Sequence, residues 1–218
     1  MASRDAIAAA QAYAGHLVRP VADVAADLES LSVLLRKWNA VQNLVSRETE
    51  KALWSRHIVD SLQVLPLLRP DDRGFIDLGS GGGFPALPLA IALKGSAAKF
   101  RLVEPTAKKA AYLRAVIREL DLAAIVDTRR AEDIDSRETA PIDVVTSRAL
   151  AALPLLCGLA APFFGPETRA IFHKGREHVE ELRETRLAWD VDVLLTNSVT
   201  DEAGVLLQLS NLRLKSVS

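Results

Sequence analysis

The spacing of apolar residues along the chain changes near position 70. Before it, apolar side chains recur every three or four residues, as at Leu28, Leu31 and Leu35, with charged residues between them, which predicts helices. A second helical stretch is predicted over 49–68, with Thr49 as its N-cap. The turn-forming sequence RPDDRG then separates this part from the rest. We therefore predict a helical N-terminal extension over 1–70 and a main domain over 71–218.

After the turn, short apolar runs alternate with helical segments. Strands are predicted at 75–78, 99–104, 125–128, 142–147, 168–174, 192–198 and 204–210, and helices at 85–94, 106–122, 150–164 and 176–189. Strand–helix alternation predicts an α/β fold, a Rossmann-like, doubly wound and mostly parallel sheet with helices on both faces. The last two strands are joined by a short segment without a helix, which favours an antiparallel C-terminal strand.

A cluster of glycines follows the first predicted strand of the main domain. The sequence FIDLGSGGGFPALPLAIAL at 75–93 places Gly79, Gly81 and Gly83 directly after that strand, with Asp77 just ahead of them. In a doubly wound sheet, ligands bind beyond the carboxyl ends of the strands. Glycine permits tight turns and lets backbone N–H groups approach a ligand closely. The loop is therefore predicted to cradle a small molecule.

The glycines alone leave the ligand open. No G-x-x-x-x-G-K-[ST] sequence is present, which excludes a P-loop nucleotide site. The segment GGGFPA at 81–86 satisfies G-x-G-x-x-A, the dinucleotide pattern, and so keeps an NAD(P)-dependent reductase as one alternative. Against it, a motif counted from Gly79 has Phe84 in place of the third glycine, and Pro85 lies inside the motif.

The order of strand, acid and glycine loop resembles the first motif of S-adenosylmethionine-dependent methyltransferases. Glu104 ends the second predicted strand about 20 residues past the loop, where an acid can hold ribose hydroxyls. The segment RAED at 130–133 follows the third strand, where the resemblance implies a carboxylate beside the adenine amino group.

Several short motifs in a fixed order resemble one family of these enzymes. They are SRHIVDS, GFP, RAEDI, VTSRALAAL and HKG, and the similarity runs from about Trp38 to the C-terminus. Together they resemble the RsmG (GidB) family, the bacterial 16S rRNA guanine-N7 methyltransferases. The resemblance implies a methyltransferase fold with a helical N-terminal extension, S-adenosylmethionine as methyl donor, and 16S rRNA or the small ribosomal subunit as partner. One departure is SGGGF, where many relatives carry a proline in the loop.

Carried over residue by residue, the resemblance places most of the cofactor contacts. These are Gly79, Phe84, Ala131, Glu132 and Arg148. We add Glu104 from its position and the other loop glycines, Gly81 and Gly83, from the predicted cradle.

The chemistry of methyl transfer limits which atom of the base can be the methyl acceptor. Methylation at carbon-5 of a pyrimidine needs a cysteine, but the one cysteine, Cys157, lies in an apolar helix and is predicted to be a core residue. An exocyclic amine usually meets an Asn/Asp-Pro-Pro-aromatic loop after the fourth strand, where this chain has TSRALAAL. Guanine N7 carries a lone pair and no proton, and so needs no general base. The absence of an evident base agrees with N7 as the target.

Two basic residues end the fourth and fifth predicted strands, where the methyl donor is expected. We predict Arg148 and Lys174 as catalytic residues, with a surface ion pair as the alternative for each. His57 and Asp60 lie one helical turn apart in SRHIVDS, and they either pack the extension onto the site or contact RNA. Basic residues on helix 106–122 and in the extension suit phosphate binding, but solvated helix faces explain them equally well.

Composition limits the class of protein and the kinds of site that the chain can form. The chain is 49% hydrophobic and 25% charged with a net charge of -1, which is typical of a soluble globular protein and gives no overall attraction to nucleic acid. One cysteine excludes an internal disulfide and a cysteine-based metal cluster. The N-terminus lacks the apolar core of a signal peptide, and no membrane span is evident. We expect a cytoplasmic monomer without a metal. The remaining alternatives are a methyltransferase of another RNA or a small molecule, the reductase, and a non-catalytic RNA-binding module.

Overall fold

The structure, a computed structural model, describes residues 2–215. Its strands are β1 (Gly74–Leu78), β2 (Lys99–Val103), β3 (Ala124–Asp127), β4 (Val144–Arg148), β5 (Arg169–Lys174), β6 (Trp189–Asn197) and β7 (Val205–Leu214). Its α-helices are α1 (Arg4–Ala12), α2 (Val21–Asn39), α3 (Arg47–Lys51), α4 (Asp60–Leu62), α5 (Ala86–Ala92), α6 (Ala107–Glu119), α7 (Leu153–Ala160) and α8 (His178–Ala188).

All seven strands join one sheet in the order β3-β2-β1-β4-β5-β7-β6. The first five pair in parallel, and β7 runs antiparallel to both of its neighbours. The carboxyl ends of β1 to β5 therefore meet at one edge of the sheet. The predicted Rossmann-like sheet with an antiparallel C-terminal strand is confirmed.

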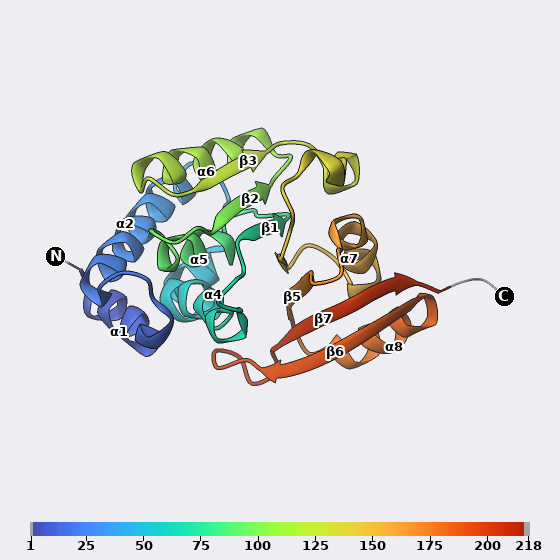
Figure 1. Cartoon of the computed structure of the whole chain (residues 1–218). Coiled ribbons are helices and arrows are strands. Elements are labelled where there is room, and N and C mark those ends of the chain that lie inside the picture. Colours follow the sequence, from blue (N-terminus) through green and yellow to red (C-terminus); the bar gives the residue numbers. More distant parts are fainter. Residues whose placement is uncertain (1, 216–218) are drawn as a thin grey trace.

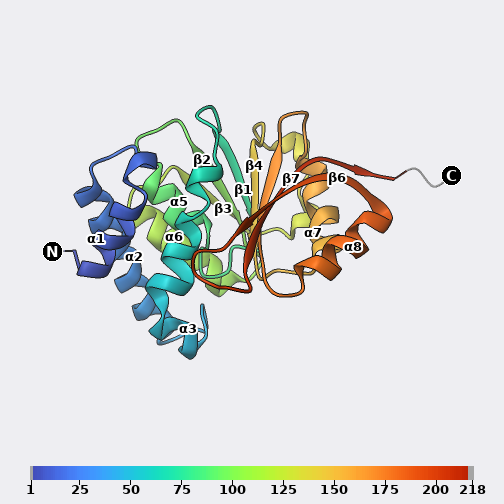
Figure 2. The ribbon, with the colours of Figure 1, turned by 90° about the horizontal axis from the view of Figure 1, so that it is seen from below.

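Helices cover both faces of the sheet, as Figures 1 and 2 show. The extension, α5 and α6 lie on one face, and α7 and α8 lie on the other. Neighbouring residues of a strand serve different faces: Phe75 belongs to the first buried cluster and Ile76 to the second. A strand buried on both sides needs apolar residues at successive positions, which explains the continuous apolar runs.

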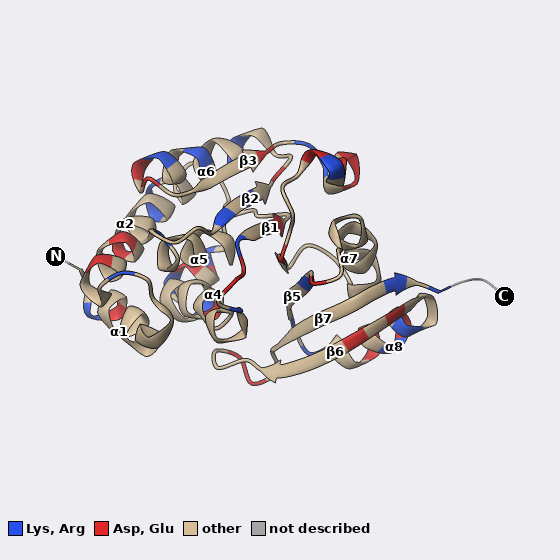
Figure 3. Cartoon of the chain, viewed as in Figure 1, with Lys and Arg blue, Asp and Glu red and all other residues tan. Residues whose placement is uncertain are grey.

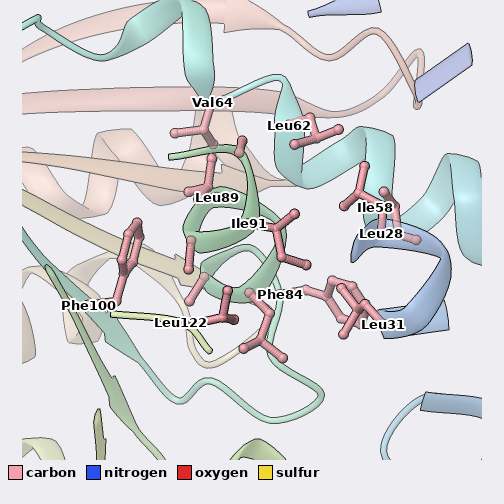
Figure 4. Close-up of a cluster of buried hydrophobic side chains, with 14 of the residues drawn as sticks. Leu28, Leu31, Ile58, Leu62, Val64, Phe84, Leu89, Ile91, Phe100 and Leu122 are labelled. Carbon is pink, nitrogen blue, oxygen red and sulfur yellow. The ribbon is translucent and has the colours of Figure 1, made fainter. Parts of the chain in front are cut away.

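The N-terminal extension shares a core with the sheet domain. Figure 4 shows Leu28 and Leu31 of α2 close to Ile91 of α5, in a cluster that also holds Phe84. Trp38 meets Tyr112 of α6 edge to face, with ring centroids 6.0 Å apart. The extension is therefore packed against α5 and α6.

The second helical stretch of the extension differs in detail from its prediction. The hydroxyl of Ser46 accepts a hydrogen bond from the N–H of Thr49 at 3.1 Å, so the helix begins at Arg47 and its N-cap is Ser46, not Thr49. Both residues are good caps, and the backbone geometry decides between them. A π-helical turn, Trp54–Val59, then precedes α4. Such turns are frequent at functional sites.

The turn before β1 is anchored by a buried ion pair. The guanidinium of Arg169, at the start of β5, pairs with the carboxylate of Asp72 and donates to the carbonyl of Leu67 at 2.9 Å. Both side chains are almost completely buried, 2% and 6% exposed. The pair therefore joins the end of the extension to the middle of the sheet. No helix within residues 2–215 is long and apolar enough to span a membrane.

We predict that Asp72→Ala lowers the free energy of unfolding by about 3–5 kcal/mol, because it leaves a buried guanidinium without its counter-charge. Urea denaturation of the parent and the variant measures this. The neighbouring exposed Asp71 provides the control: Asp71→Ala is expected to change stability by less than about 0.5 kcal/mol. Equal stability of the two variants would contradict the assigned role of the pair.

Candidate active site

The glycine loop lies between β1 and α5, at the carboxyl edge of the sheet. Gly79, Gly81 and Gly83 have φ angles of +69°, +54° and +87°, a region that other residues rarely adopt. A Cβ at Gly79 would lie 2.6 Å from Leu150, and one at Gly83 only 2.2 Å from Leu87. These two glycines are required for packing. Of the three, only Gly81 faces open space, with nothing nearer than 3.8 Å to an added Cβ, so a ligand can approach the loop on this side.

Glu104 closes one side of this loop. Its carboxylate is buried and accepts hydrogen bonds from the N–H of Gly81 at 2.9 Å and of Thr106 at 2.8 Å. The acid after β2 is therefore fixed directly beside the loop. This is the place predicted for a group that holds ribose hydroxyls.

Asp77 lies fully buried near the end of β1, ahead of the glycines. Its Oδ1 accepts from the hydroxyl of Thr146 at 2.7 Å, whereas its Oδ2 has no hydrogen-bond partner. Burial raises the pKa of Asp77 to about 7, although Ser80, Thr146 and Arg148 oppose the shift. A buried carboxylate oxygen without a donor is costly and marks a position where a ligand can supply one.

The turn after β3 carries two further predicted contacts. Ala131 and Glu132 lie in a short 3-10 turn; Ala131 is buried in the cluster that contains Ile76 and Leu78, and Glu132 is exposed. The carboxyl ends of parallel strands share one edge, so this turn lies on the same side as the glycine loop.

Arg148 ends β4 and is held by the extension. One Nη donates to the carbonyl of Arg56 at 2.7 Å and to Asp60 at 3.1 Å, and the other donates to Nδ1 of His57. The guanidinium also lies over the ring of Phe84, 5.3 Å from its centroid. With 18% of its side chain exposed, Arg148 is a largely buried, fully oriented group and not a surface charge.

His57 is a neutral acceptor in this arrangement. Burial and the charge of Arg148 lower the pKa of His57 to about 3. Because a guanidinium only donates, Nδ1 of His57 must accept, and the proton lies on Nε2. The imidazole stacks on Phe84, with ring centroids 4.8 Å apart. His57 and the guanidinium, joined by their hydrogen bond, thus both pack against the ring of Phe84.

A cleft of about 380 Å³ opens beside Arg148, within the size range of small-ligand pockets. Its walls come from the extension, the ends of β4 and β5, and the loop between β6 and β7. The charged and histidine side chains that line it are Arg56, His57, Asp60, Arg148, His173, Lys174 and Asp201.

Lys174 has its ammonium committed within the protein. It pairs with Glu181 of α8 and donates to the carbonyl of Ala151 at 3.0 Å. Glu181 also accepts from the N–H of Leu153 at the start of α7. These contacts fix the start of α7 next to the cleft. The catalytic role of Lys174 stays a prediction.

The loop between β6 and β7 was missed by sequence analysis. The hydroxyl of Thr200 donates to Asp60 at 2.6 Å, and Asp201 pairs with Arg56 at 2.9 Å. These contacts join residues about 140 positions apart, as in the pair Asp60–Thr200. The only local signal was a short polar segment between two strands.

Comparison with known proteins settles the family. The family model GidB, rRNA small subunit methyltransferase G, matches residues 25–206. Three similar proteins are all named ribosomal RNA small subunit methyltransferase G. That of Chelativorans sp. is 40% identical, covering 94% of this chain and 96% of the relative; that of Cereibacter sphaeroides is 40% identical, covering 85% and 89%; and that of Brucella ovis is 42% identical, covering 84% and 85%.

The chain belongs to the GidB family. The predicted family and the predicted enzyme class, an S-adenosylmethionine-dependent methyltransferase, are confirmed. The reductase is not favoured.

Solved structures agree on the fold. Cofactor-bound Rv0187 from MTB superposes with a TM-score of 0.59 at 16% identity, covering 86% of this chain and 90% of that one. A mutant of MtNAS in complex with S-adenosylmethionine gives 0.54 at 18% identity, covering 83% and 72%.

The residues at the carboxyl edge fit S-adenosylmethionine. This donor carries an ammonium, a carboxylate, two ribose hydroxyls and an adenine. Asp77 has an unused buried oxygen for a donor, Glu104 suits hydroxyls, and Arg148 suits a carboxylate. The open side of Gly81 leaves room for the ligand beside the backbone. Residues 2–215 hold no group of three His, Cys, Asp or Glu side chains suited to a metal ion.

We predict that Gly81→Val lowers the affinity for S-adenosylmethionine at least about tenfold, a change of about 1.4 kcal/mol. The side chain would fill the open space and resist the positive φ, which costs about 1–3 kcal/mol of stability. Calorimetric titration of the folded variant measures the affinity. Gly158→Ala, in α7 with no neighbour within 4 Å of the added Cβ, is the control. Unchanged affinity would show that Gly81 does not border the ligand.

We also predict that donor affinity rises with pH through the pKa of Asp77, about 7. If the ligand donates to Asp77, it binds the ionised form best, so protonation at low pH competes with binding. The dissociation constant should then be about tenfold higher at pH 6 than at pH 8. Titration across this range measures the effect, and Asp77→Asn should remove the pH dependence. A flat profile in the parent would argue against a ligand donor at Asp77.

Proposed function

We propose that this chain transfers the methyl group of S-adenosylmethionine to N7 of a guanine in 16S rRNA of the small ribosomal subunit. The proposal rests on the family to which the chain belongs and on one feature of the cleft. The lining groups nearest to Arg148 already form hydrogen bonds within the protein. His57 accepts from Arg148 through its one basic nitrogen, and Asp60 accepts from several donors. The other imidazole of the cleft, His173, donates through Nε2 to the Asp60 carbonyl, and its Nδ1 is buried, so it is not exposed to the cleft as a base. An arrangement in which neither imidazole presents a base suits an acceptor atom that carries no proton.

The position of the only cysteine supports the same reaction. Cys157 is buried in the cluster beneath α7, and burial raises its pKa to about 12. A thiol held protonated in the core is a poor nucleophile, because the thiolate is the reactive form. Covalent activation of a pyrimidine is therefore not supported, whereas direct displacement by a lone pair on the base is.

In this reaction the donor supplies a methyl group on a positively charged sulfur. The protein must align the acceptor atom with that methyl group and exclude water. Gly81 and Glu104 are proposed to fix the nucleoside end of the donor, and Asp77 and Arg148 its amino-acid end. The cleft beside Arg148 would receive the guanine. The fixed dipoles and charges of these groups need no rearrangement during the reaction.

Exposed basic residues provide candidates for contact with the RNA backbone. Figure 3 shows lysine and arginine along α6, where Lys108, Arg114 and Arg118 are exposed. The extension adds Arg36, Lys37, Arg47 and Lys51, also exposed. Cations on the surface can bind phosphates by releasing counterions, even where the net charge of the protein is close to zero.

The test is mass-spectrometric mapping of modified nucleosides in 16S rRNA from cells with and without this protein. We expect one N7-methylguanosine to disappear without the protein and to return with the parent. Arg148→Ala should restore at least about tenfold less activity, which needs only about 1.4 kcal/mol of lost transition-state stabilisation. Arg183→Ala, a change at a 79% exposed arginine of α8, is the matched control. An unchanged modification pattern, or loss of methylation at another atom, would contradict the proposal.

A further inference from the structure

Asp60 connects three parts of the chain at the cleft. Its carboxylate accepts from Nε2 of Gln63 at 2.7 Å, from the hydroxyl of Thr200 at 2.6 Å and from Arg148 at 3.1 Å. The first donor belongs to the extension, the second to the loop after β6, and the third to the end of β4. With 15% of its side chain exposed, Asp60 is one of the more enclosed groups in the cleft.

The hydrogen-bonding capacity of Asp60 is directed to the protein. Oδ1 receives Gln63 and Thr200, and Oδ2 receives Arg148. Its backbone carbonyl accepts from Nε2 of His173, at the end of β5, at 2.8 Å. A carboxylate engaged in this way is poorly placed to bind a substrate. Its contacts instead determine where its partners lie.

Arg148 is the partner that depends most on Asp60. Its other two acceptors, the carbonyl of Arg56 and Nδ1 of His57, are uncharged. Asp60 is the only carboxylate within ion-pair distance of this guanidinium among residues 2–215. A planar guanidinium with acceptors on both Nη atoms is held in one orientation, here over the ring of Phe84.

We propose that Asp60 is a positioning residue that acts through Arg148: it fixes the guanidinium in the orientation that binds the methyl donor and borders the acceptor base. This inference rests on the proposed function and extends it, because it gives the N-terminal extension a part in the reaction. The extension supplies Asp60, His57 and the Arg56 carbonyl, so the end of β4 receives its orientation from a segment outside the sheet domain.

A purely structural role is the competing explanation, because Asp60 also joins the extension to the loop after β6. A double-mutant cycle separates the two. If Asp60 acts through Arg148, its replacement matters only while Arg148 is present. If it merely joins segments of the protein, the two replacements have independent effects.

The experiment compares the parent, Asp60→Asn, Arg148→Ala and the double variant. The readouts are donor affinity by calorimetry and kcat/KM on small ribosomal subunits, with thermal unfolding followed by circular dichroism. We expect Asp60→Asn to lower donor affinity or kcat/KM about tenfold in the parent. In the Arg148→Ala background, the same change should cost less than about twofold.

Two further variants sharpen the result. Asp27→Asn removes the acid of another ion pair of the extension, Arg19–Asp27, of similar exposure and with no residue in the cleft, and should leave both readouts unchanged. Asp60→Glu keeps the charge and should recover part of what Asp60→Asn loses. If Asp60→Asn does not fold, the cycle is built on Asp60→Glu.

The outcomes distinguish this inference from the proposed function. Independent effects of the two replacements, or no effect of Asp60→Asn in either readout, would overturn the positioning role and leave methylation of guanine standing. A parent without activity on ribosomal RNA would overturn the proposed function. The cycle in donor affinity would then still decide whether Asp60 acts through Arg148.

Discussion

The charge of a buried arginine is the constraint on which the site depends. A guanidinium stays protonated at any physiological pH, so burial of Arg148 at the end of β4 requires a nearby carboxylate and a full set of acceptors. Burial lowers the pKa of Arg148, and Asp60 opposes that shift. The sheet domain does not supply this acid at ion-pair distance; the extension does. The extension is thereby tied to the site by electrostatics as well as by packing.

A second buried pair reinforces this attachment at the opposite edge. Arg169 starts β5 and pairs with Asp72, in the turn that leads out of the extension, whereas Arg148 ends β4 and pairs with Asp60. β4 and β5 are adjacent and parallel, so one pair lies at their amino ends and the other at their carboxyl ends. Apolar side chains of α2 and α5 add a common core to these two pairs (Figure 4). Movement of the extension relative to the sheet would disturb both pairs together.

The sheet could be predicted from the sequence because each strand is marked by residues within or next to it. Apolar runs bounded by glycine, proline and charged residues gave the strands, and parallel topology followed from the helices between them. The sequence also predicted the glycine loop, but it did not show that the three glycines have different roles. Gly79 and Gly83 are needed because Leu150 and Leu87 lie against them, whereas Gly81 borders open space. That difference depends on side chains elsewhere in the chain, so sequence spacing carries no trace of it.

The assignments left open were those that depend on distant contacts. His57 and Asp60 could be seen as a pair one helical turn apart, but their partner, Arg148, lies about 90 residues away in sequence. The N-cap predicted at Thr49 was wrong, because serine and threonine are both good caps and only the backbone geometry selects Ser46. Thr200 and Asp201 carried no motif, and only the antiparallel pairing of β6 with β7 returns them to the cleft.

Two of the buried polar atoms without partners lie where a ligand is expected, which links the stability of the fold to its function. Asp77 keeps one carboxylate oxygen without a donor, and His57 keeps its Nε2 without an acceptor. Each costs stability, since a buried polar atom without a partner loses its hydration and gains nothing in return. Nδ1 of His173, in the same cleft, is also without a partner, whereas Arg148 and Asp60 satisfy one another. A site built in this way holds its charges in place before the substrate arrives. At the end of β1, the Asp77 oxygen can still accept a hydrogen bond, which the methyl donor is proposed to provide.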